Sequence, residues 1–398
     1  MIAVYPSGWV RLICGWAALL LMPVSVWAAS WQILVVGLRD DPRYERKTLE
    51  QAFIGKPTGR PLVAAQIALD ELKDNLQDAG HQVKLQDLQW DGKSTAELLA
   101  EINKRKAQVL LLDLPAEQQK ALMEVFGKIP NAPIVFNISE SSDALRGAFC
   151  HPQWLHTLPS ERMLADATAQ WLAARNWRDV IVLVGSQPQD QALRDVWMGS
   201  VKRYGLKVKA ERKFVLSGDP RQREAGNPKL LTAEPGHDVV MVLDSVGEFA
   251  KALPYNTALP RPVVGSGGLV PLAWHTSWDR YGAPQLSKRF HKLSNKPMAS
   301  QDWASWMAVK SFTTALDEEP KATLAQLLQK LRSGTTSLDG FKGSALSFRP
   351  WDGQLRQGIF MAYGQAVAGM APVEGVLHPR EILDTLGADE PDSLCKRR

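Results

Sequence analysis

The chain has 398 residues, which is enough for two domains of ordinary size. Hydrophobic residues make up 45% of it and charged residues 22%, so the composition is that of a globular protein and excludes a disordered or fibrous one. The net charge is only +5, and the basic residues are scattered among acidic ones. We therefore expect no nucleic-acid partner.

The first 28 residues are typical of a secretory signal peptide. Arg11 is the only charge before a long neutral run, Leu12–Trp27, and the residues around Ala28 predict cleavage after it. An uncleaved membrane anchor is the alternative, because the next charge is Arg39. Gln32–Leu38 is better interpreted as a β-strand, which shortens the apolar run to signal length. We expect export with cleavage.

Cysteine usage agrees with export. Cys14 would be removed with the signal, so the mature chain keeps Cys150 and Cys395. Two cysteines in an oxidising compartment can form one disulfide, which here would tie the C-terminal tail to the middle of the chain. We predict this bridge; two unrelated thiols are the alternative.

Strand and helix patterns alternate in the first part of the mature chain. Short apolar or alternating runs predict strands at Gln32–Leu38, Val83–Leu88, Val109–Leu112 and Ile134–Phe136. Apolar residues at helical spacing predict helices at Pro61–Asp78, Thr95–Lys106 and Ala116–Phe126. Ser94 is the expected N-cap of the second of these helices.

The same alternation then repeats. Helices are predicted at Glu161–Ala174 and Gln189–Tyr204, and strands at Val180–Val184, Leu206–Leu216, Val239–Leu243 and Val263–Val264. Alternating elements of this kind specify parallel sheets with helices on both faces. We therefore predict an α/β fold of two Rossmann-like lobes, joined by hinge crossings that include Leu158–Ser160.

The last part of the chain has a different character. Ala299–Leu316 and Leu324–Leu331 are predicted helices. Trp351–Gln354 is interpreted as the turn of an antiparallel hairpin between strands at 346–348 and 359–361. The tail from Pro372 has little periodicity, so we expect it to wrap the surface.

No catalytic constellation is convincing. The chain has no Gly-x-Ser-x-Gly elbow, no His-Glu-x-x-His motif and no Walker loop. Gly265–Gly268 follows a strand, and it is either a turn beside a ligand cleft or a plain tight turn. His151 and His156, next to Cys150, are better explained by packing at the hinge strand than by a metal site. We predict that the protein is not an enzyme and uses no metal or cofactor.

Loops at the carboxyl ends of the predicted strands are the places where an open parallel sheet binds ligands. Their polar residues have two compatible interpretations, as ligand contacts or as caps of the helices that follow. The loops to watch are Arg39–Tyr44, Asp113–Pro115, Asn137–Asp143, Gly185–Asp190, Asp244–Gly247 and Gly265–Leu269.

The 14 tryptophans include a group at Trp274, Trp278, Trp303 and Trp306. Trp303 and Trp306 are three residues apart, on one face of a predicted helix. Core packing is the simpler explanation, and an aromatic wall over an apolar ligand is the alternative.

The mature chain resembles type I periplasmic solute-binding proteins of the branched-chain amino-acid class. The resemblance is carried by Gln32–Leu38, Pro61–Asp78, His156–Ser160 and Val180–Gly185. Four further stretches are similar to the subgroup associated with pyrroloquinoline-quinone (PQQ)-dependent alcohol oxidation. They are Pro260–Leu269, Trp274–Gln285, Phe348–Arg356 and His378–Arg380.

The resemblance implies a set of ligand-binding candidates. Ser139, Ser141 and Ser142 lie where the amino-acid-binding relatives hold the ligand carboxylate. The aromatic residue usual after the strand ending at Val184 is replaced by Ser186 and Gln187. Where an acidic residue usually grips the ammonium, this chain has Ser266 and Gly267, and Asp244 on a neighbouring strand end could substitute. These differences argue against an amino acid as the ligand.

The resemblance also implies the organisation and the role. The expected segments are a signal peptide (1–28), an N-terminal lobe (29–157 with 284–338), a C-terminal lobe (158–283 with 339–370) and a tail (371–398). The expected role is a monomeric periplasmic receptor that closes over a small organic solute and delivers it to the membrane permease of an ABC importer. The alternative is a ligand sensor or accessory protein of the alcohol-oxidation system, without a role in transport.

Overall fold

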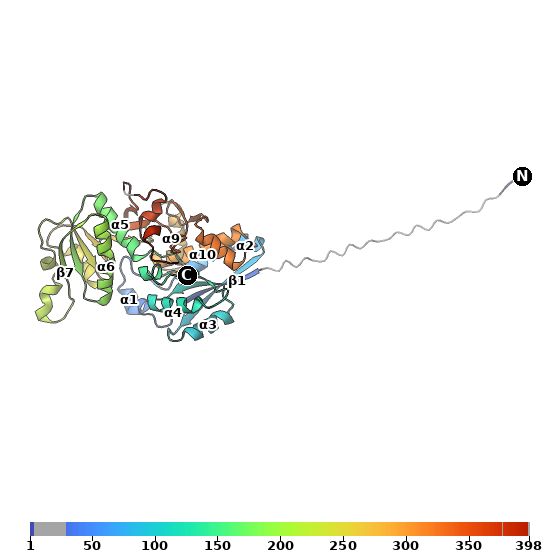
Figure 1. The fold of residues 1–398 in the computed structure, drawn as a ribbon, viewed down its shortest axis with the longest axis horizontal. Coiled ribbons are helices and arrows are strands. Elements are labelled where there is room, and N and C mark those ends of the chain that lie inside the picture. Colours follow the sequence, from blue (N-terminus) through green and yellow to red (C-terminus); the bar gives the residue numbers. More distant parts are fainter. Residues whose placement is uncertain (4–28, 376, 397–398) are drawn as a thin grey trace.

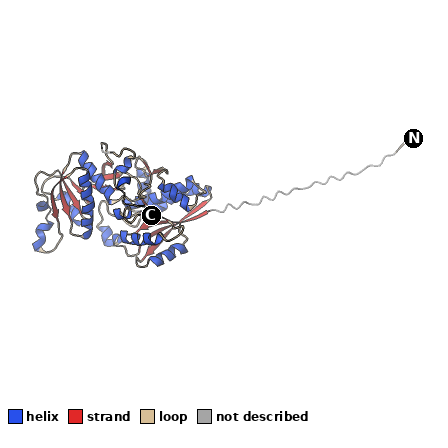
Figure 2. Ribbon diagram, viewed as in Figure 1, coloured by secondary structure: helices blue, strands red, loops and turns tan. Residues whose placement is uncertain are grey.

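The computed structural model describes residues 1–3, 29–375 and 377–396 (Figure 1). The predicted signal peptide lies almost entirely outside the described residues. Two parallel sheets packed against helices form most of the described part of the protein, together with two smaller antiparallel sheets of three and two strands (Figure 2). The prediction of an α/β fold with parallel sheets is confirmed.

The first parallel sheet has five strands in the order β2-β1-β3-β4-β5. Its strands are β1 (Ala29–Leu38), β2 (His81–Trp90), β3 (Val109–Asp113), β4 (Ile134–Asn137) and β5 (Trp154–His156). The register places Val35 of β1 opposite Leu111 of β3. Because successive side chains of a strand point to opposite faces, Ile33 and Val35 pack on one face and Leu34 and Val36 on the other.

Helices cover both faces of this sheet. One face packs against α2 (Leu62–Asp78), α9 (Ala283–Ser294), α10 (Ser300–Glu318) and α11 (Leu324–Arg332). The other packs against α3 (Thr95–Lys104) and α4 (Ala116–Phe126). The Ser94 hydroxyl accepts a hydrogen bond from Glu97 N (3.2 Å), so the predicted N-cap is confirmed.

The second parallel sheet has four strands in the order β7-β6-β8-β9, and in Figure 1 it lies at the left, in green and yellow. Its strands are β6 (Asp179–Val184), β7 (Lys207–Lys213), β8 (Val239–Leu243) and β9 (Val263–Gly265). One face packs against α5 (Glu161–Ala174) and α6 (Pro188–Arg203). The other packs against α8 (Glu248–Ala252) and the short α7 (Pro228–Leu231).

The predicted hairpin between 346–348 and 359–361 is wrong. β12 (Ala345–Leu346) pairs with β11 (Leu338–Asp339), whereas β13 (Ile359–Tyr363) lies between β10 (Val270–Leu272) and β14 (Ala366–Ala371). The predicted turn is confirmed, because Gly353 N donates to Arg349 O (3.0 Å) and Arg349 N donates to Gln354 O (2.9 Å). The chain that leaves this turn pairs with Phe348 through Leu355, in a short antiparallel bridge. The turn residues suggested that β13 pairs with the strand just before the turn. Burial between β10 and β14 determines its pairing instead.

The chain crosses between the two parallel sheets after β5. This crossing, residues 156–160, lies beside residues 353–357: His156 N donates to Gly353 O (2.9 Å) and Leu355 N donates to His156 O (2.8 Å). The Gln354 side-chain amide donates to the carbonyls of His156 and Leu158, both at 3.1 Å. Residues 156–160 and 353–357, which are distant in sequence, are therefore hydrogen-bonded to each other at the junction.

The C-terminal tail is partly buried, which corrects the expectation that it only wraps the surface. Leu383 and Leu386 are buried, and Asp384 pairs with Arg349 (2.7 Å) and Arg356 (2.9 Å). Further along, a disulfide joins Cys395 to Cys150, with their Cα atoms 5.5 Å apart. The predicted disulfide is confirmed.

No helix in the described part of the chain combines the length and the apolar character that a membrane span requires.

Candidate functional site

The carboxyl ends of the two parallel sheets meet through the loops that follow β1 and β8. A short helix, α1 (Arg46–Glu50), follows β1, and Figure 1 places it on the side of the first sheet that faces the second. Lys56, a few residues further on, donates a 2.7 Å hydrogen bond to the carbonyl of Ser245 after β8. The strand ends of both sheets therefore border one region, and the carboxyl ends of parallel strands are where open α/β sheets bind ligands.

On the first sheet, Ser139 lies next to a buried carboxyl group. Asp113 ends β3 and is fully buried, and its Oδ1 accepts hydrogen bonds from Arg43 and from the Tyr44 hydroxyl, both at 3.0 Å. Neither Asp113 Oδ2 nor Ser139 Oγ has a hydrogen bond of ordinary geometry. Burial raises the pKa of Asp113, and Arg43 and the nearby Ser139 hydroxyl oppose that rise. These two oxygens are hydrogen-bonding groups that a ligand could satisfy.

Ser141 and Ser142 fix the loop after β4 through their backbones. The carbonyl of Ser141 accepts a hydrogen bond from Glu161 N (2.8 Å), and the carbonyl of Ser142 accepts one from Arg146 (2.9 Å). Ser142 N donates to the carboxylate of Glu140 (2.8 Å). The Asn137–Asp143 loop is thereby attached directly to the first residue of α5.

On the second sheet, Ser186 and Gln187 are exposed at the end of β6. The Ser186 hydroxyl donates to Phe214 O (2.8 Å), and Gln187 N donates to the carboxylate of Asp190 (2.9 Å). The other oxygen of Asp190 accepts from both the amide (2.7 Å) and the hydroxyl (2.6 Å) of Ser245. Asp190 therefore holds the ends of β6 and β8 together.

Asp244, Ser266 and Gly267 form a compact structural unit. The two carboxylate oxygens of Asp244 accept hydrogen bonds from Gly247 N (2.8 Å) and Ala250 N (3.0 Å), so they cap α8. Asp244 N donates to the Ser266 hydroxyl (2.9 Å). A Cβ at Gly267 would collide with the carbonyl of Ala250. The local structure at Gly265–Gly268 is a tight turn packed on α8.

Sequence reasoning missed two charged residues near the strand ends, Lys56 and Glu161, whose charges act on each other. Glu161 begins α5 and accepts a 2.6 Å hydrogen bond from the indole of Trp197. Burial raises the pKa of Glu161 to about 7. Burial lowers the pKa of Lys56, whereas Asp244, Asp190 and Glu161 raise it. No periodicity or motif marks Lys56, so nothing in the sequence pattern singled it out.

The tryptophan group belongs to the core. Trp274, Trp303 and Trp306 are at most 1% exposed and pack with the helices on the first sheet. The Trp303 indole donates to Gly340 O (3.1 Å), and the ring stacks with that of Trp274. Because they are sealed from solvent, these rings do not form an aromatic wall over a ligand.

The histidines near the crossing are also in packing roles. His156 is fully buried, and its Nδ1 lies 3.0 Å from the amide of Asn137. The ring of His151 packs edge-on against Trp154, and Cys150 is in the disulfide. In the part of the chain that the structure describes, no three His, Cys, Asp or Glu side chains are grouped to hold a metal ion.

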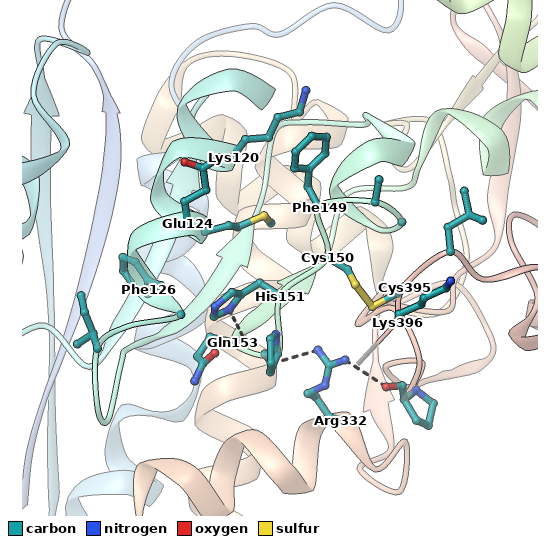
Figure 3. A pocket seen from close by; sticks show the side chains of 18 of the residues that line it. Lys120, Glu124, Phe126, Phe149, Cys150, His151, Gln153, Arg332, Cys395 and Lys396 are labelled. Carbon is teal, nitrogen blue, oxygen red and sulfur yellow. Dashed lines mark hydrogen bonds between the residues drawn. A yellow bond between two sulfur atoms is a disulfide. The ribbon is translucent and has the colours of Figure 1, made fainter. Parts of the chain in front are cut away.

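A cavity of about 1170 Å³ lies beside the disulfide, away from the strand ends. Figure 3 shows Phe126 and Glu124 from α4 on one side and Arg332 from α11 on another, with Cys150 and Cys395 at the edge. None of the eight candidate ligand residues lines it. The cavity therefore belongs to the outer surface of the first sheet's helices.

No protein-family model matches the chain, and no curated protein matches its sequence. Solved structures do. A periplasmic binding protein from Burkholderia mallei superposes with a TM-score of 0.65 and a sequence identity of 13%. The match covers 92% of this chain and 99% of the Burkholderia protein. An amino-acid ABC transporter substrate-binding protein from Pseudomonas fluorescens is 12% identical with a TM-score of 0.67, covering 93% and 99%.

A third similar structure is the solute-binding protein of an ABC transporter from R. palustris, in complex with benzoate. It is 15% identical with a TM-score of 0.61, and the match covers 93% of this chain and 99% of that one. At this level of identity the likeness establishes the fold, which is that of type I periplasmic binding proteins.

Proposed function

We propose that the chain is a periplasmic solute-binding protein of an ABC importer, which holds a small organic solute between two lobes. One observation carries the proposal: two parallel sheets present the loops at their carboxyl ends to each other, at Lys56 and Ser245. Ligands bind outside the carboxyl ends of strands in open α/β sheets. Two such edges facing each other can enclose a solute without changing it chemically.

The proposed lobes are residues 29–157 with 284–338, and residues 158–283 with 339–370. The first combination is supported by the shared core of the first sheet with α9, α10 and α11. The second is supported by the packing of Met163 and Trp171 of α5 against Ile359 and Met361 of β13. Residues 156–160, bound beside 353–357, are the proposed hinge.

The proposed contacts with the solute are the eight predicted residues, joined by Asp113 and Lys56. The first-lobe group is supported best, because the buried Asp113 Oδ2 and the adjacent Ser139 hydroxyl have no hydrogen bond of ordinary geometry. Asp244, Ser266 and Gly267 would act mainly by shaping the second-lobe wall, because their polar groups already bind α8 and each other.

The finer features of the role remain proposals. They are a membrane permease as partner, a monomeric state, periplasmic location and a link to PQQ-dependent alcohol oxidation. The support for the last is the four sequence stretches similar to that subgroup. One of them, Phe348–Arg356, lies at the proposed hinge, where Gln354 binds the carbonyls of His156 and Leu158.

The experiment uses the mature chain, residues 29–398, purified from the periplasm without denaturation. Native mass spectrometry detects any retained molecule, and thermal unfolding is measured with benzoate, 3,4-dihydroxybenzoate and leucine. A ligand present at 100 times its Kd stabilises the folded state by about 2.7 kcal/mol, which raises the Tm. The Ser139→Ala variant should show a smaller rise than the wild type. If no bound molecule and no shift appear across a wider panel of metabolites, the proposal fails.

A further inference from the structure

A segment of the first lobe, residues 51–56, is docked onto the second lobe. The ring of Phe53 lies so close to Gly247 that a Cβ there would collide with it. Gly247 has a φ of +87°, which favours glycine in any case. Ile54 packs against an apolar cluster that includes Val270 and Leu272. The side chains of residues 51–56 therefore pack tightly against the second lobe.

Polar contacts accompany this packing. Lys56 Nζ of the first lobe donates to Ser245 O of the second lobe at 2.7 Å. In the reverse direction, Lys251 Nζ of the second lobe lies 3.5 Å from Gln51 O of the first. The Lys56 ammonium also lies 5.8 Å from the centre of the Phe53 ring, within the range of a cation–π interaction. Each lobe therefore contributes a lysine to the contact.

The surroundings of Lys56 are those of a site for a cation. Asp244, Asp190 and Glu161 of the proposed second lobe all act on its charge; they lie directly after β8, in the first turn of α6 and at the start of α5, respectively. Asp190 fixes Ser245 through two hydrogen bonds, so the carbonyl that receives the ammonium is held in place. A ligand's ammonium group entering here would meet the same carbonyl, and it would feel the negative charge of the same carboxylates although their oxygens already bind backbone amides.

We propose that Lys56 occupies, from within the chain, the second-lobe position at which a ligand's ammonium would bind, and so latches residues 51–56 onto that lobe. The inference about ligands rests on the proposed function, whereas the latch itself does not. Two consequences follow. The lobes stay closed without a ligand, and the solute belongs to a class without an ammonium group, such as a carboxylic acid.

The latch is tested first on the wild-type mature chain, without any substitution. Surface amines are acetylated with a limiting dose of an N-hydroxysuccinimide ester, and the rate at each lysine is followed by mass spectrometry. Lys73 is exposed on α2 and is the internal reference. Lys56 should react at least tenfold more slowly than Lys73, because its ammonium is partly buried against Ser245. Equal rates at the two lysines would overturn the latch.

A second test measures lobe closure in solution. Small-angle scattering of the ligand-free chain is compared for the wild type, the double variant Phe53→Ala/Lys56→Met and the control Lys73→Met. The radius of gyration should rise in the double variant only, with circular dichroism showing that all three are folded. An unchanged radius in a folded double variant contradicts the latch.

The ligand class is tested with a matched pair, leucine and 4-methylpentanoate, which differ in the α-ammonium group. The wild type should bind 4-methylpentanoate at least tenfold more tightly than leucine, and Lys56→Met should reduce that ratio toward one. Tighter binding of leucine by the wild type overturns the inference about ligand class. If neither compound nor any acid of the wider panel binds, the proposed function fails, and the acetylation rate of Lys56 alone decides the latch.

Discussion

Glu161 is a buried carboxyl group at the junction between the two parallel sheets, and the charges of Asp143, Glu140 and Lys56 act on it. It begins α5, directly after the crossing, and its amide is bound to Ser141 O of the first lobe. Burial raises the pKa of its carboxyl group to about 7, the nearby Asp143 and Glu140 raise it further, and Trp197 and Lys56 oppose the rise. Its protonation state therefore changes near neutral pH.

The pH dependence of stability follows from this shift. An acid whose pKa is higher in the folded state than in the unfolded state keeps its proton longer when folded, so stability falls as pH rises from about 4.5 to about 7. Glu161→Gln should remove this part of the dependence, which is at most about 1.4 kcal/mol per pH unit. Urea unfolding at several pH values measures it. Asp302, whose pKa burial also raises to about 7, leaves a residual slope of the same sign in both proteins.

Gly185 is a second residue whose identity matters at the strand ends, because Asp190 packs directly against it. A Cβ there would collide with the carboxylate of Asp190, which cannot turn away without losing its bonds to Gln187 N and Ser245. We expect Gly185→Ala to destabilise the protein by about 1–3 kcal/mol and to weaken the contact of Ser245 with Lys56. Chemical denaturation measures the first effect, and the acetylation rate of Lys56 measures the second.

Gly199 provides the matched control for this substitution. It lies in α6 on an exposed turn, and a Cβ there would meet no atom within 4 Å. Because alanine is the better helix former, Gly199→Ala should stabilise the protein by about 0.5–1 kcal/mol. Equal effects of the two alanines would show that the collision with Asp190 has no energetic importance.

The sequence predicted the loops at the strand ends, where the cleft is proposed, better than it predicted how their side chains are used. Continuous apolar runs located the strands, and hence the loops at their carboxyl ends. They did not show that both oxygens of Asp244 are used to cap α8, because a capping carboxylate and a ligand-binding one look alike in sequence. Lys56 lies in an aperiodic segment, and only the fold brings it to Ser245.

Among the elements, the paired crossings depend most on one side chain. Gln354 donates to the carbonyls of His156 and Leu158, and its Oε1 accepts a 2.7 Å hydrogen bond from the buried Arg146. Burial lowers the pKa of Arg146 to about 10, so this guanidinium has already lost hydration. The side-chain amide of Gln354 thus forms hydrogen bonds with the buried guanidinium of Arg146 and with two carbonyl groups of the crossing.

Removing that amide should be costly. Gln354→Ala leaves the Arg146 Nε–H and two carbonyls with fewer partners, so we expect a loss of about 2–4 kcal/mol. The control is Gln329→Ala on the exposed side of α11, which should change stability by less than about 0.5 kcal/mol. Equilibrium unfolding of the two variants gives the comparison. A small effect at Gln354 would mean that water replaces the amide.

Helices and buried strands were predictable because their signals are local. The predicted helices Ala116–Phe126 and Glu161–Ala174 coincide with α4 and α5, because the apolar spacing is local and, for α5, the Ser160 hydroxyl caps the first turn. The hairpin was mispredicted because β13 pairs with β10 and β14, and burial between them decides its place. Which strands a short strand pairs with depends on the packing of the whole core. A local sequence pattern therefore does not predict its partners.

At the scale of the whole molecule, the disulfide closes a loop with a sequence separation of 245 residues. Constraining so long a loop lowers the entropy of the unfolded chain, and native disulfides commonly contribute about 2–5 kcal/mol. We expect the double variant Cys150→Ser/Cys395→Ser to lose stability within that range. The wild type treated with a reductant during denaturation is the control and should behave like the variant. Coincident unfolding curves for oxidised wild type and variant would contradict this prediction.

The tail that this bridge anchors is also fastened to the opposite lobe. Gly387 N donates to Asp166 of α5 (2.9 Å), and Asp392 pairs with Arg162 at 3.1 Å. Only eight residues separate Gly387 from Cys395, and fully extended they reach about 28 Å. In the proposed motion the tail therefore acts as a tether, and its length limits how far the two halves can separate for as long as the contacts at Gly387 and Asp392 hold.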